Sequence, residues 1–181
     1  MNIPAAEIEG VRVTKSKSAS DSRGTFIKIQ PSLEFQDGLG SIAASINPKV
    51  GTIRGLHFQI APYAEEKIVT CIQGSIFDVI VDIRPESKTF GNCATFELNA
   101  ENGIQVYLPK GIAHGFQTLK PVTIIQYCLG ATYSPESAYS IDPFGELGIN
   151  WPVKDFSISD KDTGGLSFAA AAKKYAQSLE S

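Results

Sequence analysis

The sequence predicts an all-β protein, a barrel or sandwich of many short strands followed by one helix. Runs rich in β-branched and aromatic residues recur along most of the chain, and Gly, Pro, Asn or Asp fills most of the gaps between them. Many short strands with frequent turn signals are typical of a sandwich or barrel. The predicted strands are Val11–Ser16, Thr25–Ile29, Ser41–Ile46, Thr52–Phe58, Lys67–Ile72, Ser75–Ile83, Cys93–Leu98, Ile104–Leu108, Gly115–Thr118 and Thr123–Leu129.

Three other segments complete the expected fold. The dipeptide Gln73-Gly74, between two predicted strands, predicts a tight hairpin. The stretch Ser134–Asp162 contains three prolines, several aspartates and the single tryptophan, and we expect an ordered loop that wraps the barrel. Gly165–Leu179 is alanine-rich and is the one segment with a convincing helical pattern.

Length and composition limit the possible functions. A chain of 181 residues predicts one compact domain, here residues 1–181. Hydrophobic residues make up 43% of the chain, enough for a sizeable core, and the net charge of −3 gives no support for nucleic-acid binding. Three cysteines without a C-x-x-C pair, no signal-peptide pattern and no apolar run of about 20 residues predict a cytoplasmic protein outside the membrane.

The chain has only two histidines, His57 and His114, and each lies in an apolar run punctuated by glycine or proline. This repeated context indicates that the two belong to one site. Histidine titrates near neutral pH, so the pattern favours proton transfer or metal binding. The alternative is a pair of core histidines satisfied by hydrogen bonds.

The surroundings of the two histidines separate metal binding from proton transfer. Segment Gly103–His114 has its glycines, proline and histidine at the spacing of the second half of the cupin double motif. The first half normally supplies His-x-His and Glu-x6-Gly. Here Gly74 is present, but Gln59 and Lys67 stand at two of the ligand positions. A lysine ammonium has no lone pair for a cation, so we expect a metal-free pocket.

Five motifs follow one another along the chain: Arg54–Gln59, Phe77–Arg84, Ser87–Gly91, Leu108–Phe116 and Gly148–Pro152. Together they resemble the dTDP-4-dehydrorhamnose 3,5-epimerase family, over most of the chain from about Arg23 to Asp162. The resemblance implies a jelly-roll cupin barrel, a homodimer, and activity without metal or other cofactor on a nucleotide-diphospho-4-keto-6-deoxy sugar.

The chemistry of such an epimerisation calls for particular side chains. Inverting a carbon next to a ketone requires a base, a group that stabilises the enolate oxygen, and an acid across the ring. His57 is the natural base, and Lys67 suits developing negative charge. The resemblance identifies Tyr127 as the acid and Asp162, rather than Asp160, as the partner of the base. Without the resemblance, Tyr127 is a core residue and Asp162 part of a solvated turn.

Arginines are expected to bind the nucleotide diphosphate. The resemblance gives this role to Arg54, and to Arg23 reaching across the dimer. In a regular strand Arg54 and His57 point to opposite faces, so a bulge or twist near Gly55 is needed if both reach one pocket.

Further substrate contacts are expected from Asn47, Gln59 and His114. Asp78 and Asp82 share a strand face, and we expect at least one, Asp78, to face the pocket.

Two positions depart from the family pattern at the nucleotide end of the site. Lys28 stands where the family usually has glutamate, and Ala19 where it often has an aromatic residue. The nucleotide therefore remains open among dTDP, CDP and GDP, as does the choice between one inverted carbon and two. The alternative functions are a metal-dependent cupin oxygenase or isomerase and a non-catalytic sugar-nucleotide-binding cupin.

Overall fold

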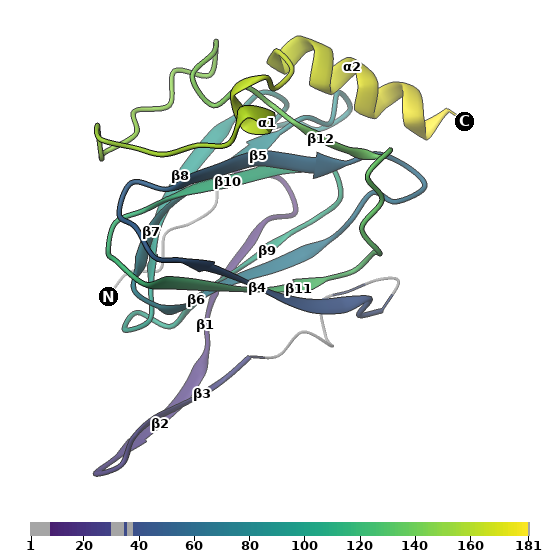
Figure 1. The fold of residues 1–181 in the computed structure, drawn as a ribbon. Coiled ribbons are helices and arrows are strands. Elements are labelled where there is room, and N and C mark those ends of the chain that lie inside the picture. Colours follow the sequence, from purple (N-terminus) through teal and green to yellow (C-terminus); the bar gives the residue numbers. More distant parts are fainter. Residues whose placement is uncertain (1–7, 30–34, 36–37, 181) are drawn as a thin grey trace.

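The fold consists of two five-stranded antiparallel sheets that face each other, a two-stranded arm and a C-terminal helix (Figure 1). The computed structural model describes residues 8–29, 35 and 38–180. The first sheet has the order β1 (Arg12–Lys15), β9 (Ile104–Leu108), β6 (Lys67–Gln73), β11 (Thr123–Leu129), β4 (Ser41–Asn47). The second has the order β12 (Ala138–Ser140), β5 (Ile53–Gln59), β10 (Ile112–Thr118), β7 (Ser75–Asp82), β8 (Cys93–Asn99). This arrangement confirms the predicted jelly-roll cupin barrel.

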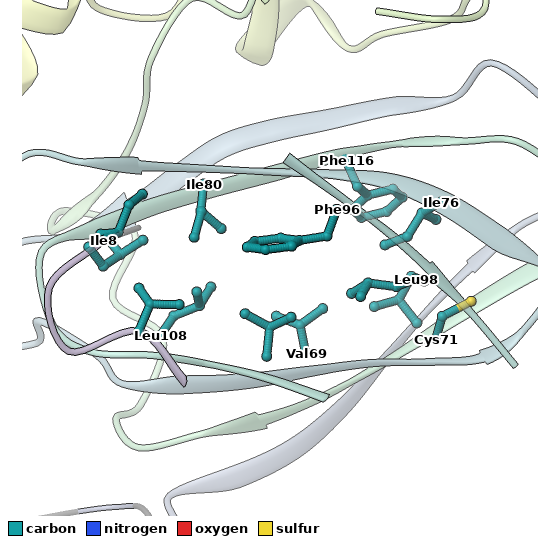
Figure 2. Packing of buried hydrophobic residues seen from close by; sticks show 13 residues of the cluster. Ile8, Val69, Cys71, Ile76, Ile80, Phe96, Leu98, Leu108 and Phe116 are labelled. Atoms are coloured by element: carbon teal, nitrogen blue, oxygen red, sulfur yellow. The ribbon is translucent and has the colours of Figure 1, made fainter. Parts of the chain in front are cut away.

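The main core fills the space between the two sheets. Figure 2 shows Ile80 and Phe96 of the second sheet above Val69 and Leu108 of the first. Strand β7 is buried along almost its whole length, because its alternate residues enter different clusters. Ile80 packs between the sheets, whereas its neighbour Val79 packs under the C-terminal segment.

The C-terminal segment covers the outer face of the second sheet, as expected for the wrapping loop. Trp151 is buried there and donates from Nε1 to the carbonyl of Pro143 at 2.9 Å. The segment also contains β12 and the short helix α1 (Asp160–Thr163), neither of which the sequence indicated. Helix α2 (Phe168–Leu179) starts three residues later than expected, where Ser167 caps it by accepting from the Ala170 N–H.

The predicted hairpin at Gln73-Gly74 is wrong. Strand β6 belongs to the first sheet and β7 to the second, so this dipeptide forms a corner between sheets. Gly74 has φ +78°, and a Cβ there would collide with Thr123 of β11. The glycine is therefore needed for the tight corner, as in a hairpin turn, but the chain leaves the corner in the opposite sheet.

Strands β2 (Lys17–Asp21) and β3 (Gly24–Lys28) form an arm that projects away from the barrel (Figure 1). The sequence indicated only the second of these strands. The side chain of Phe26 on the arm is largely exposed. The three cysteines are free thiols. Within the described ranges, no helix has the length and apolar character needed to cross a membrane.

Candidate active site

One end of the barrel encloses a cavity of about 400 Å³. Strands β5 and β10 of the second sheet, β6 and β11 of the first, and helix α1 all contribute to its walls. Seven of the ten residues expected in the site line this cavity. They are Arg54, His57, Gln59, Lys67, His114, Tyr127 and Asp162.

His57 and Asp162 form a hydrogen-bonded pair between β5 and α1. The His57 Nε2 lies 2.7 Å from Asp162 Oδ1, and Asp162 Oδ2 accepts the Gly55 N–H at 3.2 Å. A carboxylate only accepts hydrogen bonds, so this pairing places the imidazole proton on Nε2 and the lone pair on Nδ1. The His57 side chain is 44% exposed and Asp162 only 6%, so the ring is accessible from the cavity and the carboxylate is enclosed.

The Asp162 carboxyl is expected to remain ionised at neutral pH. Burial by itself raises the pKa of Asp162, but the hydrogen bond and charge of His57, with the Gly55 N–H and the Ser159 hydroxyl, lower it below its usual value. Ser159 also caps α1, and its side chain accepts the Asp162 N–H at 3.3 Å. The short helix thus holds the carboxylate in place.

A bulge in β5 brings Arg54 and His57 to the same cavity. In the register with β10, His57 lies opposite His114 but Arg54 lies opposite Phe116, so β5 carries one extra residue. Gly55 has φ +108°, and a Cβ there would lie 2.6 Å from the His114 carbonyl oxygen. The expected irregularity near Gly55 is therefore present, and only glycine fits it.

The structure places Asn47 behind Arg54 and outside the cavity lining, which corrects its expected contact with substrate. Asn47 is fully buried, and its amide nitrogen donates to the backbone of Ser45 and Thr123. Its Oδ1 accepts from Arg54 Nε at 2.8 Å. Asn47 therefore orients the guanidinium and leaves the remaining guanidinium N–H groups for a ligand.

Asp78 is likewise one step removed from the cavity. Its Oδ1 lies 2.7 Å from Nε2 of His114, which does line the cavity, and the two side chains are 0% and 5% exposed. The other oxygen, Oδ2, is buried and has no hydrogen-bond partner among the described residues. Asp78 itself is absent from the cavity lining, and His114 stands between its carboxylate and the cavity. Asp82, on the same strand, binds Arg84, Ser87 and Thr89 instead.

Tyr127 lies on β11, in the sheet opposite His57. Its ring meets the His114 ring edge-on, with centroids 6.3 Å apart. Burial, and then the negative charge of Asp78, raise the pKa of the Tyr127 hydroxyl well above its usual value. The phenol therefore stays protonated at neutral pH, as an acid must.

Lys67 also reaches the cavity, with its Nζ 2.9 Å from Glu65 Oε1. Gln59 lines the same region, but its amide is occupied: Nε2 donates to the Tyr63 carbonyl at 3.0 Å and Oε1 accepts the Ser134 N–H at 2.8 Å. Gln59 thus ties two loops together, and its expected contact with substrate stays a prediction.

Arg23 is at the tip of the arm, where it pairs with Asp21 at 2.6 Å and its side chain is 88% exposed. It does not line the cavity of its own chain.

Comparison with known proteins identifies the family. A family model described as dTDP-4-dehydrorhamnose 3,5-epimerase matches residues 5–170. The chain belongs to this family. A dTDP-4-dehydrorhamnose 3,5-epimerase from Sinorhizobium fredii is 37% identical over 90% of this chain and 87% of its own length. A dTDP-4-dehydrorhamnose 3-epimerase from Streptomyces niveus is 32% identical over 94% and 86%.

Solved structures agree with this assignment to the epimerase family. The 3,5-epimerase from Bacillus anthracis, with TDP and pyrophosphate bound, has a TM-score of 0.85 and 34% identity, covering 92% of this chain and 98% of its own. A 3'-monoepimerase from Streptomyces bikiniensis, in complex with dTDP-quinovose, has a TM-score of 0.84 and 26% identity, covering 96% and 93%.

Among the residues of the epimerase cavity that sequence reasoning missed, four carry a charged or phenolic side chain: Glu65, Tyr133, Tyr139 and Lys161. Glu65 was detectable, since it stands two residues before Lys67 and alternate residues of an extended chain share a face. The other three lie in the wrapping loop Ser134–Asp162 and just before it, where the sequence has no periodicity that would show which way a side chain points. Among the described residues, no group of three or more His, Cys, Asp or Glu side chains is arranged to hold a metal.

Proposed function

We propose that the protein epimerises a nucleotide-diphospho-4-keto-6-deoxy sugar by moving protons on opposite faces of the sugar ring, without a metal or other cofactor. The observation that carries this proposal is the pair formed by His57 and Asp162 on one wall of the cavity and Tyr127 on the other. A base and an acid on opposite walls are what an inversion requires. Family membership and the nucleotide-bound relatives support the substrate class.

The proposed reaction moves one proton off the sugar carbon and returns another to its opposite face. The Nδ1 of His57 takes the proton from the carbon next to the ketone, and the C–H electron pair moves through the ring carbon to the ketone oxygen. The ammonium of Lys67 stabilises the resulting enolate. The Tyr127 hydroxyl then protonates that carbon from the far face, which restores the ketone. Solvent returns a proton to the tyrosinate and accepts the proton from His57.

Arg54 is proposed to bind the diphosphate. Asn47 already fixes the guanidinium through Nε, so the terminal N–H groups form a preset fork for phosphate oxygens. The nucleotide, whether dTDP, CDP or GDP, is identified by assay.

We propose that residues 1–181 act as one cupin domain that forms a homodimer through its N-terminal strands. On the edge strand β4, Ile42 and Ile46 share the outer face and are 61% and 65% exposed, and Phe26 on the arm is 73% exposed. An edge strand with an exposed apolar face favours pairing with another chain. Such a dimer would carry Arg23 of the arm to the partner's cavity.

We also propose that the protein acts in the cytoplasm, because its free thiols fit a reducing compartment.

Solvent deuterium incorporation tests the proposed reaction. The purified protein is incubated in D₂O with 4-keto-6-deoxyglucose linked to dTDP, CDP or GDP, and the product is analysed by NMR. We expect deuterium at carbon 3, carbon 5 or both, with inverted configuration. Exchange with none of the three would refute the proposal. The metal-dependent alternative is tested by metal analysis and by activity after dialysis against a chelator. A metal-dependent enzyme would contain one transition metal per chain and would lose its activity when the metal is removed.

A further inference from the structure

Glu65 and Lys67 form an ion pair in the wall of the epimerase cavity. Their side chains are 13% and 7% exposed, and Nζ and Oε1 are 2.9 Å apart. Both residues line the cavity together with His57 and Tyr127. Removing two charges from water costs about as much as their attraction returns, so stability alone gives little reason for a buried pair here. A role in the chemistry of the cavity accounts for it.

The local chain geometry directs Glu65 toward Lys67. Lys67 is the first residue of β6, and Glu65, two residues earlier, lies on the same side of an extended chain. Glu66 points elsewhere and interacts with Tyr107 on the outside of the first sheet. Of these two adjacent glutamates, only Glu65 reaches the cavity.

The loop that carries Glu65 is itself held in place. Gln59 donates to the Tyr63 carbonyl at 3.0 Å and accepts the Ser134 N–H at 2.8 Å, and its Nε2 lies 3.5 Å from Glu65 Oε2. The carboxylate is thus fixed on one side by β5 and on the other by Lys67. A fixed carboxylate gives a long lysine side chain a defined position.

We propose that Glu65 is a positioning residue that holds the Lys67 ammonium against the ketone oxygen of the substrate, an inference that rests on the proposed epimerase function. A lysine ammonium has three N–H donors on a flexible four-carbon stem. One donor is used by Glu65, which leaves two for the oxygen that gains charge in the transition state. Because the ammonium is already ordered, less conformational entropy is lost when the enolate forms.

The test compares Glu65→Gln in two backgrounds. Glu65→Gln keeps the shape of the side chain and removes its charge, and we expect kcat for epimerisation to fall by about 10- to 100-fold through misplacement of the ammonium, with a smaller change in KM. In a Lys67→Met background, where the amine is absent, the same substitution should cause no further loss. Glu65→Asp should recover part of the rate. Glu136→Gln, an exposed carboxylate outside the cavity lining, is the matched control.

Each outcome decides the role of Glu65. An unchanged kcat in Glu65→Gln, or an equal loss with and without Lys67, would overturn the proposal, the latter because Glu65 would then act on the substrate or on the fold. Thermal unfolding of both glutamine variants shows whether a loss of rate follows a loss of structure. The wild-type rate is measured first: no turnover by the wild-type protein overturns the proposed function and the Glu65 role with it, whereas wild-type turnover with a normal Glu65→Gln variant overturns only the latter.

Discussion

The two histidines are both hydrogen-bonded to carboxylates, but they differ in access to the cavity. The His57 side chain is 44% exposed, and the His114 side chain only 5%. A base that removes a proton from carbon must reach its substrate and must keep an unprotonated nitrogen directed at it. This difference favours His57 as the base and leaves His114, with Asp78 behind it, as a buried pair at the floor beside Tyr127.

Replacement of Asp162 tests the contribution of the carboxylate to the base. Asp162→Asn keeps the size of the side chain but removes the charge that supports the imidazolium and allows the wrong tautomer of His57. We expect kcat to fall by as much as about 10⁴-fold with the fold intact. The rate of solvent exchange measures the activity, and circular dichroism shows whether the fold is intact. Asp160→Asn, an exposed aspartate on the same helix, should retain wild-type activity; equal losses in both variants would assign the effect to the helix.

Replacement of Tyr127 separates the two proton transfers. In Tyr127→Phe the base can still remove the proton, but the phenol that returns one from the far face is absent. We expect deuterium exchange with retained configuration and little epimerised product, detected by NMR of the recovered sugar. Epimerisation at the wild-type rate would show that another group supplies the proton.

At the scale of elements, the bulge in β5 determines the geometry of the site. Gly55→Ala adds a methyl group where φ is +108° and the His114 carbonyl is 2.6 Å away. We expect a loss of about 2–3 kcal/mol in the free energy of unfolding, and a loss of activity because Arg54 and His57 no longer share one cavity. Denaturant unfolding and kcat/KM measure the two effects.

Gly103→Ala is the matched control for this substitution. Gly103 has φ +62°, but a Cβ there meets no atom within 4 Å. The control therefore introduces left-handed strain without the clash and should reduce stability by only about 1 kcal/mol, with normal activity. If the two variants lost the same free energy of unfolding, the close approach between β5 and β10 would not be the reason that Gly55 is needed.

The corner after β7 depends on a buried ion pair. Burial raises the pKa of Asp82, but the hydrogen bonds from Arg84, Ser87 and Thr89 lower it below its usual value. Because the folded-state pKa is lowered, the ionised pair contributes stability above the ordinary aspartate pKa, and this contribution is lost as pH falls through the lower folded value. Arg84→Met should therefore cost about 3 kcal/mol near pH 7.

The cost of Arg84→Met should diminish as the solution is acidified from about pH 5 to about pH 3, because a protonated Asp82 needs no counter-charge. Denaturant unfolding across this range measures the difference. Lys88→Met, which removes an exposed cation from the same corner, should show neither the cost nor the pH dependence. A cost for Arg84→Met that stays constant with pH would contradict the ion-pair explanation.

The sequence was sufficient for the strands that alternate or are wholly apolar, such as Ser75–Asp82, since local periodicity reports burial directly. The prediction failed where contacts with distant parts of the chain determine whether a segment is a strand and which sheet it joins. Ala138–Ser140 is a strand because it pairs with β5, and Gln73-Gly74 signals a turn without showing which sheet follows. For the same reason Asn47 was expected at the substrate: the sequence indicates which face a side chain occupies, but not how deep it lies.

At the scale of the whole molecule, the arm formed by β2 and β3 projects from the barrel (Figure 1). Arg23 lies between these two strands and does not line the cavity of its own chain. If Arg23 serves the partner's cavity, Arg23→Ala and His57→Ala subunits should complement each other. In a mixed dimer, one cavity then has both substitutions and the other has neither. Co-expression should restore about a quarter of the wild-type activity, because half of the dimers are mixed and each has one working site.

This complementation is measured at low substrate concentration, with each single variant purified alone as the reference. Light scattering of the wild-type protein establishes the dimer. If the co-expressed pair is no more active than the sum of its separate variants, Arg23 acts within its own chain or not at all.

The pairing of His57 with Asp162 joins residues 105 positions apart. The last strand of the first sheet, β11, ends at Leu129, and every residue of the core between the sheets precedes that position. During synthesis on the ribosome, most of the barrel therefore emerges well before the carboxylate that completes the base. Contacts of such long sequence separation form late in folding. Catalytic competence thus reports the docking of the final segment of the chain, because until Asp162 is in place the base lacks its counter-charge.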